Sequence, residues 1–265
     1  MPKFAANLSM LFTERDFLAR FSAAADAGFR GVEYLFPYDY PAADVARALR
    51  DARLEQVLFN LPAGDWAAGE RGIACLPDRV DEFKAGVAKA VAYADVLECK
   101  RVNGLAGKVP AGVAREDAHR TFVANLRYAA HELERAGVAF VTEAVNTYDI
   151  PGFFLSRSDQ AFALFDEVGA KNLTFQYDIY HMQRMEGELA ATIRANLARI
   201  GHVQLADNPG RHEPGTGEIN YPFLFNVLDE IGYTGWVGCE YVPSSGTAAG
   251  LGWAKAYLQP AHAGA

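Results

Sequence analysis

Four side chains with oxygen ligands stand where short apolar runs of the sequence end. They are Glu143, Asp178, Gln204 and Glu240. Burying a carboxylate at the end of a strand is costly unless it meets a cation or several hydrogen-bond donors. Three carboxylates and an amide oxygen, without a thiolate, suit Mg²⁺ or Mn²⁺ better than Zn²⁺. We therefore expect one divalent-metal site built from these four residues; the alternative is that each acid is paired separately with an arginine.

A metal ion flanked by two glutamates predicts a particular chemistry. Such an ion can hold the carbonyl and hydroxyl oxygens of an α-hydroxycarbonyl compound and stabilise the enediolate that forms when a carbon loses its proton. One glutamate removes the proton and a second returns it. Return to the adjacent carbon is an aldose–ketose isomerisation, and return to the same carbon is an epimerisation. Neither reaction requires a redox cofactor.

The elements that must position these residues alternate along the chain. Apolar runs predict strands at 3–8, 31–36, 54–61, 101–105, 138–145, 172–178, 202–206 and 236–241. Helical spacing predicts helices at 13–28 (capped by Thr13), 44–52, 79–97, 116–136, 158–169, 182–199, 221–231 and 247–258. Alternation of this kind requires a parallel sheet.

Eight strand–helix units in 265 residues favour an α/β fold, a single (β/α)₈ TIM barrel spanning residues 1–265. The rival is an open doubly wound sheet, but no GxGxxG motif follows the first strand. In a barrel, the loops after the strands form the active face, and that is where the four oxygen-bearing residues are expected.

Two histidines lie close to the expected site. His181 follows Asp178 by three residues and could polarise a substrate oxygen or bond to a metal ligand, or it could simply begin a helix. His202 precedes Gln204 by two residues, so it shares that strand face deeper in the barrel. We interpret His202 as structural or as a support for a neighbouring ligand.

Four basic residues fall on loops after strands: Arg71, Lys108, Arg184 and Arg211. Cations at the mouth of an acidic protein indicate an anionic substrate such as a small carboxylate, although each alone could be a solvated surface charge. The glycine-rich tract 210–218 lacks a lysine before Ser or Thr, which excludes a P-loop. Trp66 could shield the site from water or cover the barrel rim.

The composition limits the partners. The formal net charge of −8 argues against a protein that grips nucleic-acid phosphates, so we expect a small-molecule substrate and no nucleic acid. Cys75, Cys99 and Cys239 form no CxxC pair, which indicates reduced, buried thiols and a cytoplasmic location. Neither a signal peptide nor a membrane-length apolar run is present, so no membrane partner is expected. A homo-oligomer remains open.

Several stretches of the chain resemble the hydroxypyruvate isomerases of the xylose-isomerase-like TIM-barrel superfamily. They are residues 4–12, 36–40, 60–72, 176–189 and 206–221, and the likeness extends over essentially the whole chain. The resemblance implies interconversion of hydroxypyruvate and 2-hydroxy-3-oxopropanoate (tartronate semialdehyde). Its two proton-transferring glutamates correspond to Glu143 and Glu240, and the metal ligands of related epimerases correspond to Glu143, Asp178, Gln204 and Glu240. One departure is Ala144, where the family has proline, which should loosen the turn beside Glu143.

Three other functions compete with this interpretation. The 2-oxo-tetronate isomerases share most of these stretches, and only a few residues, 180–185, lean toward the three-carbon enzyme. An apurinic endonuclease on the same fold would need a zinc cluster of several histidines, but His119, His131 and His262 fall on helices or the tail. A non-catalytic sugar-acid binder would use the same pocket without exchanging a proton.

Overall fold

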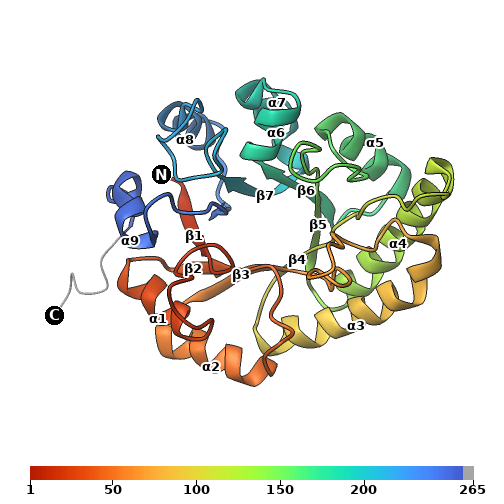
Figure 1. Cartoon of the computed structure of the whole chain (residues 1–265), viewed down its shortest axis with the longest axis horizontal. Helices are drawn as coiled ribbons and strands as arrows, with labels where there is room; N and C mark the ends of the chain where they lie inside the picture. Colours follow the sequence, from red (N-terminus) through yellow and green to blue (C-terminus); the bar gives the residue numbers. More distant parts are fainter. Residues whose placement is uncertain (259–265) are drawn as a thin grey trace.

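The barrel predicted from the sequence is confirmed by the computed structural model, which describes residues 1–258. Eight parallel strands form a closed barrel in chain order, and the helices lie outside it (Figure 1). The strands are β1 (Lys3–Asn7), β2 (Gly31–Glu33), β3 (Glu55–Asn60), β4 (Arg101–Asn103), β5 (Ala139–Glu143), β6 (Leu173–Asp178), β7 (Ile200–Leu205) and β8 (Trp236–Cys239). His262 lies outside the described residues.

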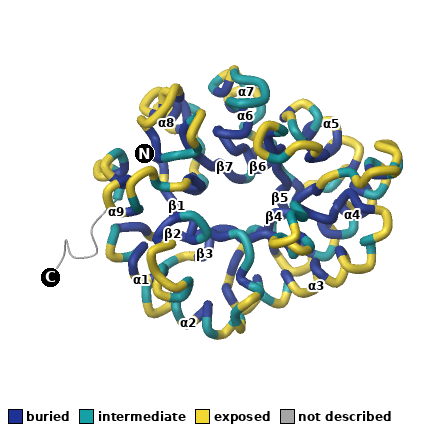
Figure 2. Tube along the Cα trace, in the orientation of Figure 1, coloured by how far each residue is buried: buried dark blue, intermediate teal, exposed yellow. Residues whose placement is uncertain are grey.

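The helices cover the outer face of the barrel. They are α1 (Ala19–Asp26), α2 (Ala42–Ala52), α3 (Val80–Val96), α4 (Arg115–Arg135), α5 (Ser158–Val168), α6 (Ile179–Met185), α7 (Leu189–Asn196), α8 (Tyr221–Glu230) and α9 (Thr247–Gly250). Short 3₁₀ segments, η1 (Pro77–Arg79), η2 (Leu197–Arg199) and η3 (Leu251–Ala254), adjoin α3, α7 and α9. The strands are buried, whereas exposed residues gather on the outward side of the helices (Figure 2).

The first helix begins later than the sequence predicts. Thr13 does not cap it, because residues 13–18 form turns and α1 starts at Ala19. The backbone after β1 is diverted at Phe12, which has a φ of 59° and donates its N–H to Oγ1 of Thr247 at 2.7 Å. This link ties the β1 loop to the C-terminal part of the chain.

Two more predicted helices are interrupted. The helix expected at 182–199 is divided into α6 and α7 because Gly187 and Glu188 adopt left-handed φ values of 68° and 45°. The helix expected at 247–258 ends early: α9 stops at Gly250 and continues only as η3. Glycine is a poor helix former, and both Gly250 and Gly252 fall in this segment.

Alternation along β6 explains how the barrel separates its core from its site. Phe175 points outward, where its ring lies 5.5 Å from that of Phe162 on α5. The alternate residues Gln176 and Asp178 point into the barrel, where both are buried. Outward apolar residues therefore hold the helices, and the inward positions are left for polar side chains.

The buried thiols expected from the sequence are confirmed, since Cys75, Cys99 and Cys239 are all free and buried. Within residues 1–258, no helix is both long and apolar enough to cross a membrane.

Candidate active site

The carboxyl ends of β5 to β8 bring the four predicted residues to one end of the barrel. Glu143 ends β5, Asp178 ends β6, Gln204 lies one residue before the end of β7, and Glu240 directly follows β8. The strand register sets Asp178 beside Gln204. All four side chains are buried. Because parallel strands present their carboxyl ends on the same face, these residues line one buried polar mouth.

Glu143 is held by a neighbouring strand. Nδ2 of Asn103, at the end of β4, donates to Oε1 of Glu143 at 3.0 Å. Burial, with the charge of Asp178 nearby, raises the pKa of Glu143 to about 7. A carboxyl group with a pKa near neutrality can both accept and release a proton, which is what acid–base catalysis requires.

Asp178 has one satisfied oxygen and one free oxygen. Its Oδ1 accepts hydrogen bonds from the backbone N–H groups of Tyr180 at 2.8 Å and His181 at 3.3 Å, which caps α6. Its Oδ2 is buried without a hydrogen-bond partner. Burial raises the pKa of Asp178 to about 6, although Arg211 opposes the change. An unpartnered buried carboxylate oxygen is costly and fits a position that binds a cation.

Arg211 lies between two of the acids. Its Nη2 is 3.5 Å from Oε1 of Glu240 and 3.9 Å from Oδ2 of Asp178. Burial raises the pKa of Glu240 well above its usual value, although the Arg211 charge opposes this. The arginine comes from the loop after β7, where Asp207 accepts the backbone N–H groups of Gly215 and Gly217. Arg211 is the predicted cation that contacts the carboxylates.

Gln204 is oriented by buried polar neighbours. Its Nε2 donates to Oε1 of Glu33 at 2.7 Å, and its Oε1 accepts from Nε2 of Gln176 at 2.6 Å. The amide oxygen therefore points to the Gln176 side of the barrel. Gln176 in turn has an Oε1 atom without a partner.

A different but overlapping trio satisfies the geometry of a metal site. Across residues 1–258, one group of His, Cys, Asp and Glu side chains could hold an ion: Glu143, Asp178 and His181, whose ligand atoms all lie within 4.8 Å of one another. The free Oδ2 atom of Asp178 supports the same interpretation. The donor set is dominated by oxygen and fits a hard divalent cation.

His181 is completely enclosed at this mouth. Its Nε2 lies 3.6 Å from Oδ2 of Asp178, and its Nδ1 lies 2.7 Å from Nδ2 of Asn146. Burial, with the charges of Arg211 and Arg184 nearby, lowers the pKa of His181 well below its usual value. The imidazole is therefore neutral, and Asn146 is a neighbour that the sequence analysis missed.

The other predicted basic residues do not contact the acids. Arg71 stacks on Trp66, with the guanidinium 4.2 Å from the ring, and donates to the Trp66 carbonyl at 2.9 Å. Lys108 is exposed. Arg184 lies 3.2 Å from Asp149. The ring of Trp66 packs 5.0 Å from that of Phe36.

Polar residues that end the first four strands were also missed. They are Asn7, Glu33, Asn60 and Asn103, each buried at the last position of its strand. The signal in the sequence was weak, because each of them lies inside its predicted strand and is followed by at least one more residue of that strand. The polar mouth therefore extends around the whole barrel.

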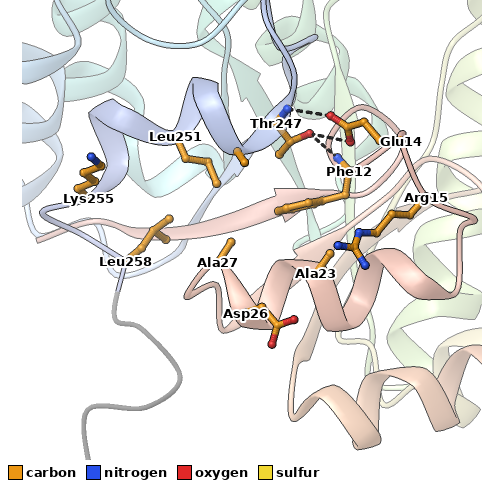
Figure 3. A pocket seen from close by; sticks show the side chains of 11 residues that line it. Phe12, Glu14, Arg15, Ala23, Asp26, Ala27, Thr247, Leu251, Lys255 and Leu258 are labelled. Atoms are coloured by element: carbon orange, nitrogen blue, oxygen red, sulfur yellow. Dashed lines mark hydrogen bonds between the residues drawn. The ribbon is translucent and has the colours of Figure 1, made fainter.

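A separate cavity of about 720 Å³ lies outside this mouth, between α1 and the segment that contains α9 (Figure 3). Its wall includes Phe12, Leu251 and Leu258. Two hydrogen bonds from Thr247 to the carboxylate of Glu14 close one side of it. None of the predicted site residues lines this cavity.

The closed eight-stranded barrel and its buried acidic mouth are those of a TIM-barrel enzyme, and sequence comparison identifies the family. Residues 21–257 match the family described as xylose isomerase-like TIM barrel, and the chain belongs to that family. The chain is 57% identical to the hydroxypyruvate isomerase of Escherichia coli (strain K12), over 97% of this chain and 100% of that protein. It is 50% identical to the 2-oxo-tetronate isomerase of Cupriavidus necator, over 97% and 99% of the two chains. The predicted enzyme class, an isomerase, is confirmed.

Solved structures support the fold. A crystal structure from Brucella melitensis, described as an AP endonuclease of family 2, superposes with a TM-score of 0.95 at 47% identity and covers 98% of this chain and 100% of that one. A D-psicose 3-epimerase from Clostridium cellulolyticum superposes with a TM-score of 0.76 at 19% identity, covering 93% and 87% of the two chains. The second likeness concerns the fold alone.

Proposed function

We propose that the protein interconverts hydroxypyruvate and 2-hydroxy-3-oxopropanoate (tartronate semialdehyde). The observation that carries this proposal is the pair Glu143 and Glu240, two buried glutamates with raised pKa values at one barrel mouth. Identity of 57% to a hydroxypyruvate isomerase over nearly the whole chain supports the choice of substrate.

The reaction requires two proton transfers. One glutamate removes a proton from C3 of hydroxypyruvate, and the electron pair of that C–H bond forms the C2–C3 double bond of an enediolate. The other glutamate delivers a proton to C2. The hydroxyl proton moves from O3 to O2, so O3 becomes the aldehyde oxygen and the atoms balance. Glu143 and Glu240 perform the two carbon-proton transfers.

The site is also suited to a divalent cation, Mg²⁺ or Mn²⁺, held by Glu143, Asp178, Gln204 and Glu240. The free Oδ2 of Asp178 supports this assignment, and Glu143 and Asp178 both belong to the group of side chains that could hold an ion. Gln204 and Glu240 complete the set by resemblance to the related epimerases. When bound, such an ion supplies Lewis-acid stabilisation of negative charge on substrate oxygens.

The substrate carboxylate is held by the basic side of the mouth. Arg211 is the first choice because its guanidinium lies within 4 Å of two site carboxylates and is only partly exposed. A guanidinium can bind a carboxylate with two parallel hydrogen bonds. Arg71 and Lys108 are retained as secondary candidates on neighbouring loops, and His181 binds a substrate oxygen.

A second candidate reaction is the isomerisation of 2-oxo-tetronate, a four-carbon acid. Relatives of that name are 50% and 47% identical over 97% and 99% of this chain. An endonuclease activity is less consistent with the residues, because His119 and His131 lie on the outer helix α4, away from the mouth, where His119 is half-buried and His131 is exposed. The experiment below distinguishes an isomerase from a non-catalytic binder.

The test is proton NMR of hydroxypyruvate incubated with the protein in D₂O, with EDTA or with added Mg²⁺ or Mn²⁺. We expect tartronate semialdehyde to appear with deuterium on carbon, and EDTA to abolish turnover. Turnover that survives thorough chelation would support the isomerase activity and show that the reaction needs no metal ion. Turnover of 2-oxo-tetronate alone would select the second candidate, and no deuterium uptake into either acid would indicate a binder.

Glu240→Gln should reduce turnover by a factor on the order of 100 or more while the protein remains folded.

A further inference from the structure

The hydrogen-bond partners of Asn146 determine which end of its side-chain amide is the nitrogen and which is the oxygen. Asn146 lies in the loop after β5 and is completely buried. Its Oδ1 accepts the backbone N–H of Asp149 at 2.8 Å, and its Nδ2 donates to Oδ2 of Asp149 at 3.0 Å. A backbone N–H can only donate, and an ionised carboxylate can only accept. The amide nitrogen and oxygen of Asn146 are therefore distinguished at both ends.

Asp149 is held in its ionised form by its surroundings. Burial raises its pKa, but hydrogen bonds from Asn146 and Tyr180 and the charge of Arg184 outweigh burial, so the pKa of Asp149 lies below its usual value. The Tyr180 hydroxyl donates to Oδ2 of Asp149 at 2.7 Å, and Arg184 lies 3.2 Å from Oδ1. A flipped Asn146 amide would set oxygen against this carboxylate and is excluded.

The orientation of Asn146 determines which ring nitrogen of His181 carries the proton. Nδ2 of Asn146 lies 2.7 Å from Nδ1 of His181, and both side chains are buried. Because Nδ2 is a donor, Nδ1 of His181 must accept, and the single ring proton must be on Nε2. That Nε2 atom faces Asp178, at 3.6 Å from Oδ2.

We propose that Asn146 is a positioning residue that holds His181 in the Nε2–H tautomer, so that His181 presents a hydrogen-bond donor to the mouth and not a metal ligand. A protonated Nε2 has no lone pair for a cation, although the position of His181 beside Glu143 and Asp178 would otherwise suit one. The ion is left to the oxygen ligands. The tautomer itself is independent of the reaction; the use of Nε2–H on a substrate oxygen rests on the proposed function.

The test is NMR of the full chain labelled with ¹⁵N-histidine, since long-range ¹H–¹⁵N correlations distinguish the two neutral tautomers. The His181 signals are identified by their loss in His181→Gln. We expect the Nε2–H pattern in the parent protein, unchanged by saturating Mg²⁺. An Nδ1–H pattern, a doubly protonated ring at pH 7, or loss of the Nε2 proton on adding Mg²⁺ would overturn the proposal.

The variant Asn146→Asp tests the cause. It is combined with Asp149→Asn, so that no second carboxylate faces the new one at 3.0 Å. The carboxylate at position 146 then accepts a hydrogen bond, so His181 should change to the Nδ1–H tautomer. The matched control is Asn220→Asp, the same chemical change at the exposed N-cap of α8, where either side chain can accept from Phe223 N–H. It should leave His181 unchanged. A folded Asn146→Asp/Asp149→Asn protein that retains the Nε2–H tautomer would contradict the assignment.

A second variant covers the case in which Asn146→Asp disturbs the loop. Asn146→Ala removes the donor, and the His181 signals should then show a mixture of tautomers; a pure Nε2–H pattern would contradict the role of Asn146. If the proposed isomerase activity holds, Asn146→Ala should lower kcat by at least about tenfold and change KM by less, because a lost donor acts mainly on the charged intermediate. The NMR result is independent of whether any substrate turns over.

Discussion

Nε2 of His202 lies 2.7 Å from Oε2 of Glu33, and both side chains are completely buried. The other oxygen of Glu33 accepts Nε2 of Gln204 at 2.7 Å and Nδ2 of Asn7 at 3.1 Å. Three strands, β1, β2 and β7, are thus joined through one carboxylate. Because the Glu33 carboxylate accepts Nε2 of Gln204, it directs the Gln204 amide oxygen away from itself.

Glu33→Gln should destabilise the protein, because it replaces this carboxylate with an amide. The new amide would set its NH₂ group against one of the donors now bound to Glu33, leaving a buried donor unpaired. We expect a loss of about 2–4 kcal/mol in the free energy of unfolding, measured by urea denaturation, and weaker Mg²⁺ binding by calorimetry. Glu134→Gln, at an exposed position of α4, is the control. Equal stability of the two variants would show that Glu33 is not needed as an acceptor.

Gly238→Ala approaches the same carboxylate from β8. A Cβ atom at this position would lie 2.3 Å from both oxygens of Glu33, too close for either to remain. We expect Glu33 to shift, Gln204 to lose its orientation, and the protein to lose about 1–3 kcal/mol of stability. Gly252→Ala is matched, because nothing lies within 4 Å of its Cβ. A crystal structure of Gly238→Ala with an unmoved Glu33 would disprove the steric argument.

The closed barrel was predictable because its evidence is local. Apolar runs and helical spacing recur through the whole chain, and only a parallel sheet satisfies that alternation. The last four strand exits were predictable for the same reason, because Glu143 and Asp178 visibly end apolar runs. Helix ends were harder: α1 starts only at Ala19, and the loop before it is held by a bond between Phe12 and Thr247, residues near opposite ends of the sequence.

The internal arrangement of the site was not predictable from spacing. Gln204 carries two different polar ends, and which end faces the mouth is decided by Glu33 on β2 and Gln176 on β6. Similarly, His181 was a candidate ligand or donor from its position, and its bond to Asn146 distinguishes the two roles. Along the chain, Gln204 is 28 positions from Gln176 and 171 positions from Glu33. His181 is 35 positions from Asn146.

Arg211 should determine substrate affinity. If it holds the substrate carboxylate, Arg211→Lys retains the charge but loses the paired hydrogen bonds, and KM for hydroxypyruvate should rise on the order of tenfold. Arg211→Ala should raise it further, with a smaller change in kcat. Steady-state kinetics measures both, with Arg135→Lys at the exposed end of α4 as control. An unchanged KM in both Arg211 variants would move the carboxylate to another cation.

Glu143 should make the stability of the metal-free protein depend on pH. Burial raises its pKa from 4.5 to about 7, so the folded protein retains a proton that the unfolded chain releases. Its contribution to stability is therefore complete below pH 4.5 and is lost as the pH rises through 7. Glu143→Gln cannot ionise and avoids this loss. In EDTA, we expect it to gain on the order of 2 kcal/mol relative to the parent between pH 5 and 8.

The buried histidines His181 and His202 are present in both proteins, so their own pH dependence cancels in the difference. Glu240 is also present in both, but the charge of Glu143 raises its pKa, so removing that charge lowers the pKa of Glu240 and adds to the gain in the same direction. The comparison is made by urea denaturation at each pH, and Glu134→Gln should show no such gain because its side chain is exposed. Saturating Mg²⁺ should close the gap, since a bound cation stabilises the ionised form of Glu143 and removes the cost of burying its charge. A difference between Glu143→Gln and the parent that stays constant from pH 5 to 8 in EDTA would mean that Glu143 is ionised in the folded protein without a metal ion.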